Sequence, residues 1–207
     1  MSKPAGYDPM IKICGLTSYE DAKLAADLGA DLLGVIMDRS VKRHGDQELV
    51  KRIKDLGKGV VGVYTDMRSV SSSDLNEDFV QLHFPHTPDE ISSVKYDLGK
   101  KVISVVKLTD VNEAVSLICE YHDAGSDFIL LERKEGISDA LSQVEIILKN
   151  YDIGISGGIN ASNIDLLLPL EPSFVDLSSS VESSVGKKDE KKMRDFFAKL
   201  GGDHAGS

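Results

Sequence analysis

The feature that most constrains the fold is a series of eight short apolar runs, rich in β-branched residues and spaced along most of the chain. They occupy residues 10–14, 32–37, 59–64, 79–83, 101–106, 127–132, 152–156 and 174–178. Most are continuous apolar runs and do not alternate strictly with polar residues. Continuous runs are typical of strands buried on both faces, as in a parallel sheet.

The segments between these runs have helical patterns. Ser18 is a candidate N-cap for a helix that ends at Gly29. Further helices are predicted over 46–56, 110–124, 138–149, 161–168 and 188–199, and more weakly within 67–77 and 87–98. Eight strands alternating with about eight helices predict an α/β fold, a single compact (β/α)8 TIM barrel. A doubly wound open sheet is the alternative.

The barrel is expected to span residues 10–200 as one domain, between a flexible N-terminal leader at 1–9 and a flexible tail at 201–207. The chain has 207 residues and a net charge of -10. This charge argues against non-specific binding to nucleic acid or to an anionic membrane. The sequence shows neither a membrane-spanning segment nor the apolar core of a signal peptide, so a cytoplasmic location is expected.

The two cysteines are too few for a disulfide framework, and their spacing does not match a zinc site. Cys14 ends the first apolar run, directly before Gly15, where a barrel strand would present it at the catalytic mouth. Cys119 lies within a predicted helix and is interpreted as a small buried structural residue.

Active sites of such barrels form at the C-terminal ends of the strands. This rule selects Cys14 and a group of residues from later strands and loops: Arg43, His83, Glu132, Gly157, Gly158, Asp176, Ser178 and Ser179. Of these, Gly157 and Gly158 precede a predicted helix, and Ser178 and Ser179 follow the neighbouring strand. Backbone N–H groups at such a position bind phosphate well. Simple glycine and serine turns are the alternative interpretation.

Several motifs, in this order, resemble the phosphoribosylanthranilate isomerase family of tryptophan biosynthesis. They are "KICGLTSYEDA", "GADLLGVI", "VKRH", "VQLH", "ISGGINASNI" and "VDLSSSVESSVGKKDEKKMRDFF". The resemblance covers about residues 10–200. It implies an Amadori rearrangement of an aminoaldose phosphate to an aminoketose, without a metal or organic cofactor. The substrate is a phosphorylated small molecule, and the family includes monomers and dimers, so a monomer or a homodimer is expected.

The resemblance also implies roles for individual residues. Cys14 is expected to be the general base, and Arg43 to lie near the anthranilate carboxylate. The loops that hold Gly157, Gly158, Ser178 and Ser179 are expected to bind the phosphate. His83 could bind substrate or be structural, and Asp176 is a candidate substrate-binding residue from its position at a strand end.

The general acid is where the sequence departs from the family. An aspartate is usual at the end of the sixth strand, and this chain has Glu132 within "ILLERKEG". Glu132 is therefore the predicted acid, and Glu135 and Asp139 are alternatives that could reach the same mouth. This change leaves two other functions open: a related sugar-phosphate isomerase or lyase, and a non-catalytic barrel that binds a phosphorylated ligand.

Overall fold

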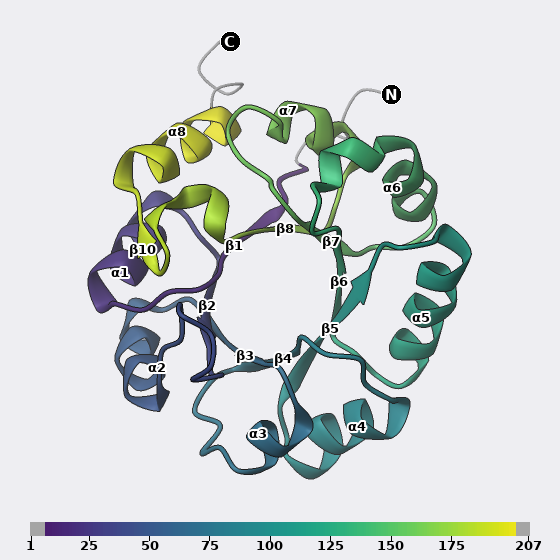
Figure 1. Cartoon of the computed structure of the whole chain (residues 1–207), viewed down its shortest axis with the longest axis horizontal. Coiled ribbons are helices and arrows are strands. Elements are labelled where there is room, and N and C mark those ends of the chain that lie inside the picture. Colours follow the sequence, from purple (N-terminus) through teal and green to yellow (C-terminus); the bar gives the residue numbers. More distant parts are fainter. Residues whose placement is uncertain (1–6, 202–207) are drawn as a thin grey trace.

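The computed structural model describes residues 7–201, which form a closed barrel of eight parallel strands surrounded by helices (Figure 1). Each strand pairs with the next along the chain, and β8 pairs with β1 to close the barrel. The predicted (β/α)8 barrel is confirmed. The strands are β1 (Met10–Ile13), β2 (Leu32–Ile36), β3 (Gly59–Tyr64), β4 (Phe79–Leu82), β5 (Lys101–Lys107), β6 (Phe128–Glu132), β7 (Gly154–Ser156) and β8 (Phe174–Leu177).

The helices form an outer ring around these strands (Figure 1). They are α1 (Tyr19–Leu28), α2 (Gln47–Ile53), α3 (Met67–Ser71), α4 (Pro88–Ser92), α5 (Val111–Asp123), α6 (Leu141–Leu148), α7 (Ile164–Leu167) and α8 (Glu190–Gly201). The Ser18 side chain accepts from the Asp21 amide, and Gly29 ends α1 with a φ of 110°, as predicted for these caps. The two weakly predicted segments contain the five-residue helices α3 and α4.

The barrel interior is apolar at its base. Phe128 lies between Phe79 and Phe174, with ring centroids 5.8 and 5.7 Å away. Gly154 leaves room for the Phe174 ring, because a Cβ atom there would lie 2.2 Å from that ring. Two positions beyond this apolar layer, toward the C-terminal ends of several strands, the inward-facing residues are polar. They form the floor of the catalytic end.

The loop after β8 contains a small hairpin that was not predicted. A 3-10 turn at Ser179–Val181 leads into β9 (Glu182–Ser184) and β10 (Lys187–Lys188), which pair antiparallel. Asp21 of α1 accepts a hydrogen bond of 2.9 Å from the Lys188 amide, which ties the hairpin to the barrel wall. Strands of two and three residues are too short for a hydrophobic pattern to reveal.

Residues 1–6 of the predicted leader and 202–207 of the predicted tail lie outside the described residues. Within the leader, the Tyr7 hydroxyl donates to the Pro172 carbonyl. None of the helices within residues 7–201 is long and apolar enough to cross a membrane.

Candidate active site

A cavity of about 900 Å³ opens at the C-terminal ends of the strands. All nine residues selected from the sequence line it: Cys14, Arg43, His83, Glu132, Gly157, Gly158, Asp176, Ser178 and Ser179. Chain positions more than 160 residues apart therefore meet at one mouth, as the strand-end argument predicts. Cys119 does not belong to this group. It is exposed on α5, so its predicted burial is wrong.

Cys14 follows β1 directly and is buried, with 6% of its surface exposed. Burial raises the pKa of its thiol, because the thiolate loses water. The ammonium groups of Lys12 and Lys188 act in the opposite direction, while the Asp176 carboxylate adds to the rise. The thiol is therefore held beside two cations that favour its ionised form.

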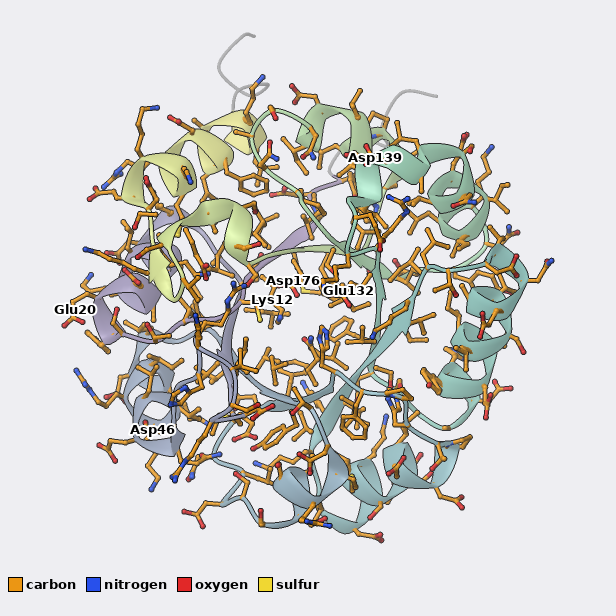
Figure 2. All side chains as sticks on the ribbon, in the orientation of Figure 1. Lys12, Glu20, Asp46, Glu132, Asp139 and Asp176 are labelled. Carbon is orange, nitrogen blue, oxygen red and sulfur yellow. The ribbon has the colours of Figure 1, made fainter. Side chains whose placement is uncertain are left out.

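Lys12 and Asp176 form an ion pair at the centre of the barrel, with Nζ and Oδ2 2.9 Å apart (Figure 2). The Lys12 side chain is completely buried. Burial alone would lower its pKa, but the Asp176 carboxylate and the Cys14 sulfur outweigh this effect and raise the pKa above its usual value. Lys12 was missed from the sequence. The sequence feature that could have identified it is its position two residues before Cys14, which puts both side chains on one face of a strand.

Lys188 of β10 approaches Cys14 from the hairpin. Its buried ammonium group donates to the Cys14 carbonyl at 2.6 Å, to the Ser178 carbonyl at 3.1 Å and to a Glu182 carboxylate oxygen at 3.3 Å. An ammonium group has three hydrogens, so each can have an acceptor. This lysine was not selected from the sequence either. It links the end of β1, where the Cys14 thiol lies, with the loop after β8.

Glu132 and His83 face each other at the mouth, with Oε2 and Nε2 3.4 Å apart. Burial would raise the pKa of Glu132, but the contact with His83 and the positive charges of Lys107 and Lys12 lower it below its usual value. The two alternative acids differ in position. Glu135 lines the cavity, whereas Asp139 does not and lies at the periphery beside α6 (Figure 2). The prediction that Asp139 could reach the mouth is wrong.

The loops after β6 and β7 lie against each other. The Ile137 amide donates to the Gly157 carbonyl at 2.9 Å. Gly157 has a φ of 115°, and a Cβ atom there would lie 2.0 Å from the Arg133 carbonyl oxygen. Only glycine fits this position without moving the backbone.

The helix predicted over 161–168 begins later, at Ile164, and has four residues in α7. Side chains compete with the helix here. Asn163 Oδ1 accepts from the Asn160 amide, and Asn160 Oδ1 accepts from the Ser162 amide. So short a helix has little dipole, so anion binding here would depend on local backbone N–H groups.

Arg43 lies against the loop after β8. Its Nη1 donates to the Ser178 hydroxyl at 3.2 Å, and its Nη2 lies 3.6 Å from a Glu182 carboxylate oxygen. Gly15 makes room for this arginine, because a Cβ atom at Gly15 would lie 2.9 Å from Arg43 Cδ.

Three buried side-chain atoms that lack a partner within residues 7–201 belong to residues lining the cavity. They are Gln81 Oε1, Ser156 Oγ and Asp176 Oδ1. Buried polar atoms are rarely left unpaired in folded proteins. Their concentration at one cavity indicates that polar groups of a ligand, or ordered water, complete the site.

A sequence model of the N-(5'-phosphoribosyl)anthranilate (PRA) isomerase family matches residues 11–199. The N-(5'-phosphoribosyl)anthranilate isomerase of Thermoplasma volcanium is 40% identical over 92% of this chain and 95% of its own length. The crystal structure of phosphoribosyl anthranilate isomerase from Thermotoga maritima is 25% identical and superposes with a TM-score of 0.80, over 94% of this chain and 100% of that one.

A further crystal structure of a phosphoribosyl anthranilate isomerase is a complex with reduced 1-(o-carboxyphenylamino)-1-deoxyribulose 5-phosphate. That protein is 26% identical to this chain, with a TM-score of 0.75, over 94% of this chain and 100% of its own.

Proposed function

The chain belongs to the phosphoribosylanthranilate isomerase family of tryptophan biosynthesis, and we propose that Cys14 and Glu132 are the base and the acid of its isomerase reaction. The family's reaction is an Amadori rearrangement of N-(5'-phosphoribosyl)anthranilate. The observation that carries the proposal is that a thiol and a carboxyl group, each a competent proton-transfer group, line the same cavity.

The reaction begins at the furanose ring. Glu132 gives a proton to the ring oxygen while the bond from that oxygen to the first ribose carbon breaks, and the nitrogen lone pair forms a Schiff base. The Cys14 thiolate then takes the proton from the second ribose carbon, which gives an enolamine. Transfer of a proton to the first carbon and loss of the hydroxyl proton convert the enolamine to the ketone. The substrate nitrogen accepts the electrons.

Two features support Cys14 as the base. Its thiol follows β1 at the cavity, and Lys12 and Lys188 favour the thiolate that must exist before it can accept a proton. Glu132 is supported by its position at the end of β6, on the same cavity.

The remaining cavity residues fit the two anionic ends and the sugar. Gly157, Gly158, Ser178 and Ser179 are proposed for the phosphate because their loops meet at one side of the mouth. Arg43 is proposed for the carboxylate, since Ile36, Val41 and Val63 line the same cavity and offer an apolar wall to an aromatic ring. The free Asp176 oxygen is proposed to accept from a sugar hydroxyl.

The proposed site is built from residues of this chain. It is compatible with a monomer or with a homodimer. The proposed substrate is a small phosphorylated molecule, the proposed chemistry uses no metal or organic cofactor, and we propose a cytoplasmic enzyme.

Loss of phosphoribosylanthranilate fluorescence tests the proposal. The wild type is expected to turn over, and Cys14→Ser and Glu132→Gln are each expected to reduce kcat/KM by about 100-fold or more. Cys119→Ser and Asp139→Asn are matched controls away from the mouth and should retain full activity. Full activity of Cys14→Ser would exclude Cys14 as the base. Full activity of Glu132→Gln would move the acid to another residue, with Glu135 examined first.

A further inference from the structure

We propose, resting on the proposed function, that Glu132 and His83 act together as one acid, and that Gln81 positions His83 in both of its protonation states. In this arrangement the proton used for ring opening is held by the pair rather than by Glu132 alone. His83 is the source that supplies the proton, and Glu132 is the group that delivers it to the substrate.

The contact between the two side chains spans a strand. His83 follows β4 and Glu132 ends β6, and β5 lies between them in the barrel. Even so, His83 Nε2 and Glu132 Oε2 are 3.4 Å apart. An aspartate has one methylene fewer, so its carboxyl group would fall short of the imidazole. The length of the glutamate is what makes the pair possible.

Gln81 supplies the second part of the argument. Its Nε2 lies 3.5 Å from the other imidazole nitrogen, His83 Nδ1, and its Oε1 is buried without a partner within the described chain. The amide can donate to an unprotonated Nδ1. Rotated by half a turn, it can accept from a protonated Nδ1 instead. Nδ1 keeps its hydrogen when Nε2 gives up its proton, so the rotated amide, with Oε1 as the acceptor, satisfies His83 before and after that step.

The charges around the pair explain why Glu132 needs a second group. Three groups lower the pKa of Glu132: first the contact with His83, then the positive charges of Lys107 from β5 and Lys12 from β1. The Asp176 carboxylate of β8 interacts with both His83 and Glu132. The positive charges hold the pKa of Glu132 below its usual value. A glutamate is ordinarily ionised at neutral pH, and these contacts favour the ionised form further, so Glu132 has a proton to give only when His83 supplies one.

The protons balance over one turnover. His83 Nε2 passes its proton to the Glu132 carboxylate, and Glu132 passes it to the ring oxygen as the bond from that oxygen to the first ribose carbon breaks. Cys14 takes the proton of the second carbon and gives it to the first. The hydroxyl proton released as the enol becomes a ketone returns to the pair, so no proton is consumed.

The test is the ratio of wild-type to variant kcat/KM as a function of pH, for His83→Asn, Glu132→Asp and the double variant. The ratio cancels the titration of Cys14, which all four proteins share. For His83→Asn we expect the ratio to rise by at least tenfold between pH 5 and pH 7.5, because a glutamate is ordinarily ionised at neutral pH and the variant has no neighbour to supply its proton. Glu132→Asp should show the same rise, and the double variant should match the single variants instead of multiplying their losses.

A ratio that is independent of pH would overturn the pairing, since a merely structural role of His83 lowers activity equally at every pH. Multiplicative losses in the double variant would overturn it too. His122→Asn, on the exposed face of α5, is the matched control and should match the wild type. If His83→Asn does not fold, Glu132→Asp alone must shift the profile. Absence of wild-type turnover would instead contradict the proposed function.

Discussion

The two sides of the mouth differ in how firmly they are held. On the β1–β8 side, Cys14 is 6% exposed, and the Lys12 and Lys188 side chains are completely buried with paired ammonium groups. On the β4–β6 side, the His83 and Glu132 side chains are 33% and 23% exposed and share one contact of 3.4 Å. The proposed base therefore belongs to the folded core, whereas the proposed acid stands at a solvated edge.

This difference has an energetic reason. A buried thiol ionises only if fixed positive charge replaces the water it has lost, and buried charges need partners of their own. A carboxylic acid that exchanges protons benefits from nearby solvent and an adjustable neighbour. Changes on the base side should therefore reduce stability as well as activity, while changes on the acid side should reduce activity alone.

The largest effect is expected for Lys12→Met. It leaves the buried Asp176 carboxylate without its partner, and breaking such a pair costs about 3–5 kcal/mol of unfolding free energy. Urea unfolding measures this loss. Lys23→Met, which removes an exposed pair with Asp27, is the control and should cost less than about 1 kcal/mol. Adding Asp176→Leu to Lys12→Met should recover much of the stability. Equal costs for the two lysines would remove the contrast between the sides.

Lys188→Met is expected to come next, with a loss of about 3 kcal/mol. It removes three hydrogen bonds to a buried ammonium group, but Arg43 remains 3.6 Å from the other Glu182 oxygen and partly compensates the carboxylate. The variant should also alkylate more slowly at Cys14 with iodoacetamide, because one thiolate-stabilising charge is gone. Lys187→Met, exposed on the same strand, should leave both measurements unchanged.

Gly157→Ala should cost less, about 1–3 kcal/mol in stability. The backbone at this position has a φ of 115°, and the new methyl group would meet the Arg133 carbonyl. Since the loop is proposed to bind phosphate, KM should rise more than kcat falls. Gly99→Ala, also at positive φ but with open space around it, separates backbone strain from the clash. Equal losses in both variants would show that the clash contributes nothing.

The smallest stability effect is expected for Glu132→Gln, within about 0.5 kcal/mol at pH 7 despite the large loss of activity. The pKa of Glu132 is lowered in the folded protein, so its contribution to stability is present above the unfolded-state pKa and disappears as the pH falls through the folded-state value. The wild type and the variant should therefore become equally stable in acid. A destabilisation of several kcal/mol at pH 7 would place Glu132 in the core with Cys14.

Much of the site could be predicted from the sequence because a barrel brings all strand ends to one face. Knowing that Cys14, His83, Glu132 and Asp176 end their strands was enough to place them together. The buried lysines were not predictable in this way. The partner of Lys12 is 164 residues away on β8, and no local pattern connects the two.

Other differences have local physical causes. The hairpin that carries Lys188 consists of strands too short to show a period, and the asparagine turns that delay α7 satisfy the backbone with side chains. Asp139 misses the mouth because a 3-10 turn at Ile137–Ala140 directs the chain outward toward α6. Such details depend on the shape of a loop, which the residue order alone does not fix.

The pH dependence of kcat/KM for the wild type, Cys14→Ser and Glu132→Gln tests the division of the mouth most directly. The wild type should give a bell-shaped profile. Cys14→Ser should lose the rising limb, because no thiol remains to ionise, and Glu132→Gln should lose the falling limb, because the group that delivers the proton to the substrate is gone. A profile that keeps both limbs in either variant would contradict the assignment of base and acid to these two sides.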